Sequence, residues 1–198
     1  MKNKRKTARG LVVVLSSPSG GGKTTVAQRL LRAEKDLVRS VSCTTRKPRP
    51  GERNGRDYFF VTVDRFKRMI AKREFLEWAR VHRNLYGTPR AWVEGQLRQG
   101  KDVLFVIDVQ GGHTLRRKVP GAVLIFLYPP SLRVLRERLV GRGTNDAKDL
   151  KVRLADARWE MRQGREYGHP IVNDRLPRTV REVRRVLREA RKAAGAGT

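Results

Sequence analysis

The stretch Leu11–Thr25, LVVVLSSPSGGGKTT, combines an apolar run, a glycine-rich turn and a lysine followed by two threonines. Residues 11–15 are apolar and largely β-branched, which predicts a strand buried on both faces of a parallel sheet. Glycines 20–22 tolerate positive φ and let backbone N–H groups approach an anion. Lys23 can reach the outer phosphates of a nucleotide, and the Thr24 hydroxyl can bind Mg²⁺. The stretch therefore predicts a phosphate-binding loop between a strand and a helix.

The loop departs at one position from the pattern G-x-x-x-x-G-K-[ST], because Ser17 stands where the first glycine is usual. The rest of the loop still lies between an apolar run and a helical pattern, as phosphate binding requires. The alternative is an ordinary glycine-rich connection that happens to carry a lysine. We expect phosphate binding.

The composition of the 198-residue chain favours one core with small inserted lobes and an anionic partner. Lysine and arginine number 46 against 19 aspartates and glutamates, giving a net charge of +27. This excess suits nucleotides, RNA or DNA, although a solvated basic surface is the alternative. A nucleic-acid contact through the basic surface is therefore expected to be weak and electrostatic, and residues 1–10 are expected to form a disordered basic tail.

The cysteine content and the apolar runs bear on where the chain works. Cys43 is the single cysteine, so no internal disulfide can form and a reducing cytoplasm is expected. The apolar runs are far shorter than a membrane span, and no secretory signal is visible. The sequence thus predicts a cytoplasmic protein without a membrane contact.

Apolar strands alternate with helical patterns, which predicts a three-layer α/β fold with a parallel core sheet. The apolar run 103–107 ends at Asp108, which places a carboxylate beside the phosphate loop. Thr88 before Pro89 predicts the N-cap of a helix that runs to about Gln99. The expected parts are a core (11–39, 100–135 and 168–192), an inserted lobe (40–99), a mobile charged lid (136–167) and tails at 1–10 and 193–198.

The long charged loop 42–58 carries groups that suit a phosphate monoester. Two guanidinium groups and two hydroxyls can bind its dianion. Tyr86 can add a third hydroxyl, and Glu77 can accept hydrogen bonds from the N1–H and 2-amino groups of guanine, a pair that adenine lacks. The alternatives are a solvated basic loop and a surface salt bridge for Glu77. The phosphate-binding candidates in the loop are Ser42, Arg46, Arg49 and Tyr58.

Over nearly all of residues 11–190 the sequence resembles the guanylate kinase family. TTR-x-PRPGE, followed at this distance by FLE-x-A and YGT, is more specific than the phosphate loop. The resemblance implies a P-loop nucleoside-monophosphate-kinase-like fold with a core, a GMP-binding lobe and an ATP-side lid. It also implies reversible, ATP- and Mg²⁺-dependent phosphorylation of GMP and dGMP. The stretches that carry it are SSPSGGGKTT, VSCTTRKPRPGERNGRDYFF, FLEWA, LYGT, IDVQG, PPS, ERLVGRGT and IVND.

The resemblance implies a role for each matching residue. For GMP binding it implies Ser42, Arg46, Arg49, Tyr58, Glu77, Tyr86, Thr88 and Asp108. For ATP binding it implies Ser17, Pro18, Ser19, Gly20, Gly21, Gly22, Lys23, Thr24, Thr25, Arg142 and Asn173. For phosphoryl transfer it implies Lys23, Arg46, Arg138, Arg142 and Arg153. For Mg²⁺ it implies Thr24, with Asp108 acting through a water molecule.

One departure from the family pattern concerns the metal. The family usually shows Asp-x-Asp where this chain reads Val106-Ile107-Asp108. Val106 cannot hold Mg²⁺ or its water, so either Asp108 serves two tasks or Thr24 and the nucleotide phosphates hold the metal largely alone, and reduced turnover is expected. Two alternatives remain: a related sugar-phosphate kinase, against which Glu77 argues, and a non-catalytic nucleic-acid-binding or scaffold protein, against which the intact Lys23 argues. The sequence predicts no oligomeric state.

Overall fold

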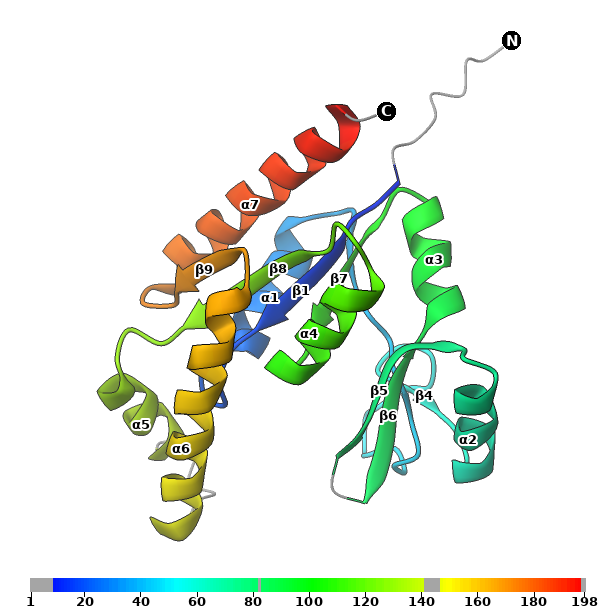
Figure 1. Ribbon diagram of the computed structural model, residues 1–198, viewed down its shortest axis with the longest axis horizontal. Coiled ribbons are helices and arrows are strands. Elements are labelled where there is room, and N and C mark those ends of the chain that lie inside the picture. The colour runs from blue at the N-terminus through cyan, green and yellow to red at the C-terminus, as the bar shows by residue number, and fades with distance from the viewer. Residues whose placement is uncertain (1–8, 82, 141–146, 197–198) are drawn as a thin grey trace.

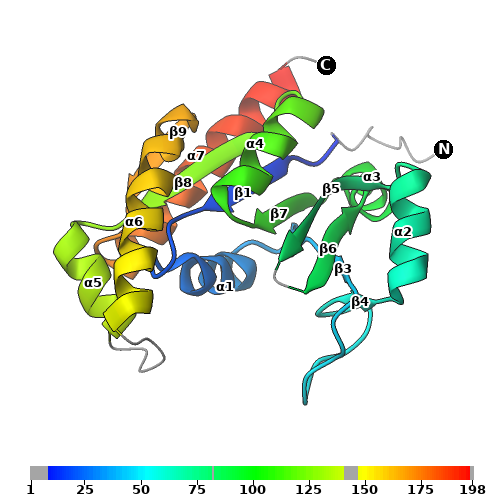
Figure 2. The same cartoon turned by 60° about the horizontal axis from the view of Figure 1, so that its bottom comes forward.

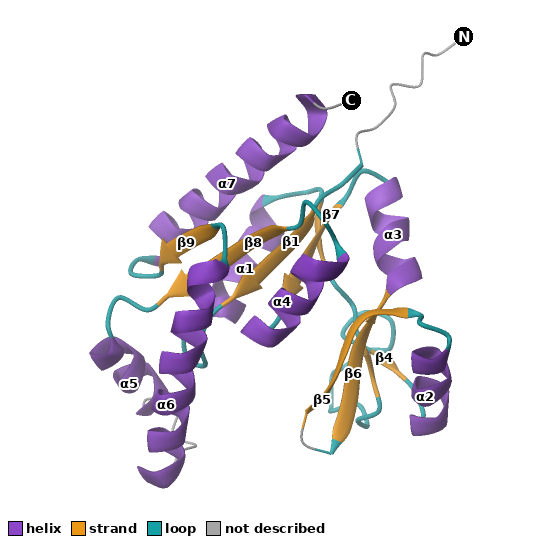
Figure 3. Ribbon diagram, viewed as in Figure 1, coloured by secondary structure: helices purple, strands orange, loops and turns teal. Residues whose placement is uncertain are grey.

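The computed structural model describes residues 9–81, 83–140 and 147–196 (Figure 1). Most of the predicted N-terminal tail, Arg142 and the last two residues lie outside the described residues. The core is a parallel sheet in the order β2-β7-β1-β8-β9 (Figure 3). Its strands are β1 (Val12–Ser16), β2 (Leu37–Arg39), β7 (Asp102–Val106), β8 (Val123–Tyr128) and β9 (His169–Val172).

Helices cover both faces of the core sheet, which explains why its central strands are almost entirely apolar. Helices α1 (Lys23–Ala33) and α7 (Leu176–Ala196) pack on one face. On the other face lie α3 (Arg90–Arg98) and α4 (Val109–Lys118). Figure 2 shows α1 and α4 on opposite sides of β1. The predicted three-layer fold with a parallel core is confirmed.

The inserted lobe has its own sheet and its own small core. The strand order of this sheet is β4-β3-β6-β5. In the core of the lobe, Phe66 stacks on Phe75 with ring centroids 4.5 Å apart. Helix α3 follows the lobe in sequence, but its Val93 and Leu97 pack against the core sheet. The lobe consists of β3 (Cys43–Thr44), β4 (Phe59–Phe60), α2 (Val63–Ala71), β5 (Phe75–Val81) and β6 (Asn84–Pro89).

Two helices occupy the region predicted as a lid. They are α5 (Leu132–Val140) and α6 (Ala147–Gln163), and a 3₁₀ turn, η1 (Gly164–Glu166), leads back to the core. Leu135, Leu139 and Ala157 form a separate apolar cluster between them. Figure 1 shows α5 and α6 on one side of the core and the lobe on the other, so the carboxyl edge of the sheet lies between them.

None of the helices in the described ranges is long and apolar enough to cross a bilayer.

The prediction that Thr88 caps a helix was wrong. Thr88 lies in β6, opposite Glu77 of β5, and the N-cap of α3 is Pro89. Pairing with β5, the preceding strand of the same hairpin, extends β6 to the start of the helix, and this pairing overrides the local capping preference. The Thr88 hydroxyl is consequently available to Glu77.

A cluster of ion pairs fastens α7 to the core. The Asp102 carboxylate is 3% exposed, and it accepts hydrogen bonds from the Leu11 backbone N–H (2.8 Å) and from Arg191 Nε (2.7 Å). Glu34 accepts from Arg184 Nε (2.6 Å) and from Arg191 Nη1 (2.8 Å). Asp102 therefore joins the first strand, the edge of β7 and the last helix.

We expect Asp102→Ala to destabilise the protein by about 2–3 kcal/mol, because it leaves a partly buried N–H and a partly buried guanidinium without their acceptor. Urea unfolding measures the change. The control is Glu94→Ala, which removes an exposed carboxylate 3.9 Å from Arg98 and should stay within about 0.5 kcal/mol of wild type. Equal effects of the two substitutions would contradict this account.

Candidate active site

The phosphate loop connects β1 to α1 and forms one wall of a cavity of about 320 Å³. All nine loop residues named from the sequence, 17–25, line this cavity together with Asp108 and Glu160. Gly22 precedes α1 with φ of 89°, and a Cβ at this position would collide with the Asn173 amide. Gly22 is therefore required by both backbone conformation and space.

Lys23 is fixed between the loop and the edge of the sheet. Its Nζ donates to the Ile107 carbonyl at 3.1 Å and to the Ser17 carbonyl at 3.4 Å. Burial lowers the pKa of Lys23, while the nearby carboxylates of Glu160 and Asp108 oppose that shift. A desolvated cation in this position favours an incoming phosphate.

Asn173 and Arg138 support the loop from behind. The Asn173 amide donates to the Gly21 carbonyl at 2.8 Å and accepts from the Thr179 hydroxyl at 3.0 Å. Arg138 of α5 donates to the Asn173 carbonyl at 3.1 Å, which brings a lid arginine next to the loop. Arg153 lies on α6 and does not line the cavity, and Arg142 is outside the described residues.

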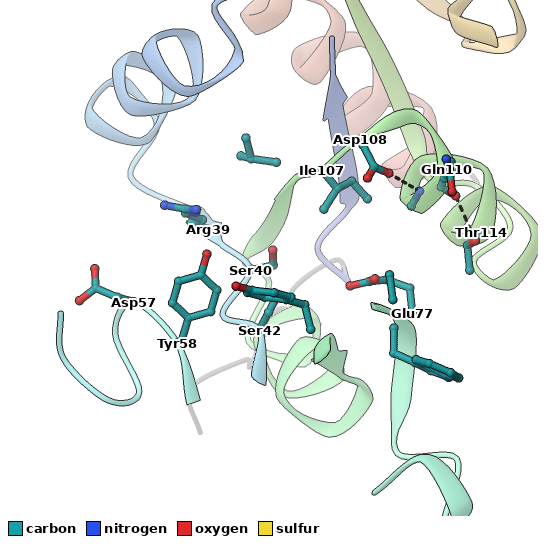
Figure 4. A pocket seen from close by; sticks show the side chains of 15 residues that line it. Arg39, Ser40, Ser42, Asp57, Tyr58, Glu77, Ile107, Asp108, Gln110 and Thr114 are labelled. Atoms are coloured by element: carbon teal, nitrogen blue, oxygen red, sulfur yellow. Dashed lines mark hydrogen bonds between the residues drawn. The ribbon is translucent and has the colours of Figure 1, made fainter. Parts of the chain in front are cut away.

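A second cavity, of about 290 Å³, lies between the lobe and the core (Figure 4). Glu77 in its wall accepts a hydrogen bond of 2.6 Å from the buried Thr88 hydroxyl, which also lies 3.0 Å from the Ser42 hydroxyl. Burial raises the pKa of Glu77, and the bond from Thr88 partly offsets this. Five predicted acceptor residues line the cavity: Ser42, Tyr58, Glu77, Tyr86 and Asp108.

The two lobe arginines that were predicted to bind phosphate, Arg46 and Arg49, do not line this second cavity. Arg46 pairs with Glu52 at 2.8 Å, and its guanidinium lies 5.4 Å from the centroid of the Tyr58 ring. Arg49 is exposed, and its backbone N–H donates to the other Glu52 oxygen at 2.7 Å. Glu52 thus joins the Arg46 guanidinium to the Arg49 backbone, and this ion pair competes with a phosphate for Arg46.

Asp108 lines both cavities. Its carboxylate accepts from the Gly111 backbone N–H at 2.8 Å and caps α4, and its carbonyl accepts from the Ser16 hydroxyl at 3.3 Å. The Asp108 side chain therefore lies between the phosphate-loop cavity and the cavity that contains Glu77, whose carboxylate can accept hydrogen bonds from guanine. This arrangement suits two phosphorylated ligands that meet end to end.

Comparison with known proteins agrees with this geometry. Residues 9–190 match the family model for guanylate kinase. The chain belongs to the guanylate kinase family. A guanylate kinase of Dechloromonas aromatica (strain RCB) is 46% identical over 187 residues, 94% of this chain and 93% of that protein.

The relationship to guanylate kinases extends to other sequences and to a solved structure. A guanylate kinase of Thermotoga maritima is 44% identical over 183 residues, 92% of this chain and 88% of that protein. A crystal structure of guanylate kinase from Anaplasma phagocytophilum superposes with a TM-score of 0.71 at 36% identity, covering 92% of this chain and 86% of that one. The resemblance seen in the sequence motifs is confirmed.

Membership in the guanylate kinase family implies Mg²⁺, and the residues present fit a metal that is held mainly by phosphates and water. Thr24 presents an exposed hydroxyl in the loop cavity, and Asp108 lies across from it. Within the described residues, no group of three or more His, Cys, Asp or Glu side chains is placed to hold a metal. Thr24 and Asp108 would be enough for Mg²⁺, because this ion keeps several waters and takes few protein ligands.

Glu160 is a residue of the site that sequence reasoning missed. It lies on α6, and its Oε2 accepts a hydrogen bond of 3.3 Å from the Ser19 backbone N–H, inside the phosphate-loop cavity. Burial raises the pKa of Glu160, whereas the Ser19 bond and Lys23 lower it. A carboxylate thus lies where a phosphate anion is expected, in contact with the same loop.

We expect Glu160→Gln to tighten ATP binding by roughly fivefold, because it removes a like charge close to the bound phosphates. Isothermal titration calorimetry with ATP measures the change. Glu137→Gln on α5 is the matched control, because its carboxylate is exposed and 3.7 Å from Arg133. Weaker ATP binding by the Glu160 variant would show instead that this carboxylate supports the nucleotide or its metal.

Proposed function

We propose that this protein reversibly transfers the γ-phosphoryl group of ATP to the phosphate of GMP, giving ADP and GDP, with dGMP as a second acceptor. The observation that carries this proposal is the position of Asp108 in the wall of both cavities. One cavity contains a phosphate loop, and the other contains Glu77 held by Thr88. Family membership supports the same reaction.

The transfer needs positioning and charge neutralisation, because it passes through a loose, in-line transition state. The attacking group is already a phosphate oxygen, so no covalent nucleophile and no strong general base is required. Two anions repel as they approach, and the Lys23 ammonium lies where the loop cavity meets the end of β7. Lys23 is therefore the group placed to stabilise charge on the transferred phosphoryl.

Mg²⁺, when bound with ATP, would neutralise charge on the outer phosphates. Thr24 would hold it directly, and Asp108 would do so through a water molecule. Val106 has no carboxylate to contribute, and its side chain packs with the apolar cluster on the α1 face of the sheet. The metal site therefore depends on the nucleotide itself for most of its oxygen ligands.

Guanine selection rests on Glu77. A carboxylate fixed by Thr88 offers acceptors to the N1–H and 2-amino groups of guanine, whereas adenine presents an acceptor at N1. Burial of Glu77 strengthens this preference, because a buried polar group without a partner is costly. A sugar phosphate needs no guanine pocket, which argues against a sugar-phosphate kinase.

The donor side is completed by arginines from the lid. Arg138 already contacts the residue that supports the loop, and we propose that Arg142 and Arg153 join it when the lid closes on ATP. Closure would assemble the positive charge only around bound nucleotide and would exclude water that otherwise hydrolyses ATP.

The setting of this reaction follows from composition. A cytoplasmic location is supported by the single, buried and unbridged Cys43, which suits a reducing compartment. The net charge of +27 favours anionic substrates and leaves a weak electrostatic contact with nucleic acid as a prediction. Intact Lys23 and the paired cavities argue against a purely non-catalytic binder.

We expect Lys23→Met to lower kcat by roughly 10²-fold, because it removes one donor that stabilises the transition state. A coupled assay of ADP release with ATP, Mg²⁺ and GMP measures the rate. Lys35→Met, an exposed lysine just after α1, is the control and should turn over at the wild-type rate. A Lys23 variant within about threefold of wild type would remove this residue from the mechanism.

In the same assay with GMP, dGMP, AMP, CMP and UMP, the wild type should turn over only the guanine nucleotides. Glu77→Gln should reduce the preference for GMP over AMP by about 1–3 kcal/mol in kcat/KM, because one guanine donor loses its acceptor. Glu74→Gln, an exposed position three residues earlier, is the control. Absence of turnover with every acceptor would contradict the proposed function, and unchanged discrimination would contradict the role of Glu77 alone.

A further inference from the structure

The side chain of Arg39, the last residue of β2, lines the second cavity, between the lobe and the core, which is the expected acceptor cavity (Figure 4). It is exposed, and within the described ranges no hydrogen bond or ion pair holds its guanidinium. Arg46, by contrast, is paired with Glu52. Among the described residues that line this cavity, Arg39 is the one cation.

Strand pairing places Arg39 on the face of the sheet that carries the phosphate-loop helix. Arg39 lies opposite Leu104 of β7, and both Leu104 and Leu37 belong to the apolar cluster that α1 covers. Helix α1 begins with Lys23 at the same carboxyl edge. The Arg39 side chain therefore enters the acceptor cavity from the core, on the side where the donor phosphates are expected.

The Asp57 carboxylate, which interacts electrostatically with Arg39, already has two other partners on its Oδ2 atom. Asp57 accepts from the Arg53 backbone N–H at 2.8 Å and pairs with Arg56 at 2.8 Å. These two bonds lower the pKa of Asp57, and the more distant Arg39 guanidinium contributes least. On the neighbouring strand, Val106 presents no carboxylate to the cavity. The positive charge of Arg39 is consequently available to a ligand.

We propose that Arg39 binds the phosphate of the acceptor nucleotide from the core side, opposite Tyr58 and the arginines of the lobe. This inference rests on the proposed function. A phosphate dianion has enough oxygens for several guanidinium forks, each of which binds it through charge-assisted hydrogen bonds. With one fork on the core and others on the lobe, the acceptor phosphate itself would bridge the two parts. Arg39 would also offset repulsion between the two phosphates as they approach.

The test compares Arg39→Gln with wild type, using GMP and guanosine as ligands. By titration calorimetry the Kd for GMP should rise about 10- to 100-fold, the range expected when a charged phosphate contact is lost. The inhibition constant of guanosine against GMP, and the KM for ATP, should change by less than about twofold, because neither involves this contact. Arg39→Lys should recover part of the GMP affinity.

The matched control is Arg188→Gln, which alters another exposed arginine on α7 away from both cavities. It should leave GMP and guanosine binding unchanged. Unaltered GMP affinity in Arg39→Gln, or equal losses for GMP and guanosine, would overturn the proposal. Equal and non-additive losses from Arg39→Gln and Asp57→Asn would also overturn it, because they would indicate a latch between core and lobe. Failure of wild type to bind GMP would instead count against the proposed function.

Discussion

The parallel pairing of β1 with β7 is the constraint on which the site depends. Both strands end at the same edge of the sheet, so the phosphate loop after β1 and the Asp108 turn after β7 emerge side by side. The bond from Lys23 to the Ile107 carbonyl and the bond from Ser16 to the Asp108 carbonyl join these two turns directly. The lobe and the lid then contribute their side chains from either side of these two turns, whose positions the core sheet fixes.

The sequence was most informative where the functional residues are adjacent in the chain. The apolar run, the glycines and Lys23 follow one another in the chain, so their local pattern predicted both the strand and the loop that the structure shows. The family motifs then predicted an acceptor set drawn from separate parts of the chain, and Ser42, Glu77 and Asp108 do line one cavity. These residues meet because of the topology of the fold. The family motifs imply this topology, whereas the local periodicity of apolar residues does not reveal it.

The remaining features depend on contacts that local sequence patterns do not reveal. Glu160 reaches the loop across 141 residues, and nothing in its charged helix distinguishes it from its neighbours in the sequence. Thr88 was read as a helix cap because its pairing with Glu77 of β5 is invisible to local preference. Likewise, composition does not reveal that Arg46 pairs with Glu52 and does not line the cavity.

The shared wall at Asp108 gives the two cavities a direct means of thermodynamic coupling. A ligand that alters the field, hydration or orientation of this carboxylate from one side changes the free energy of binding on the other side. The dependence is reciprocal, so the factor by which the donor changes acceptor affinity equals the factor by which the acceptor changes donor affinity. Cooperativity between substrates therefore requires no long pathway in this protein, because a single side chain belongs to both sites.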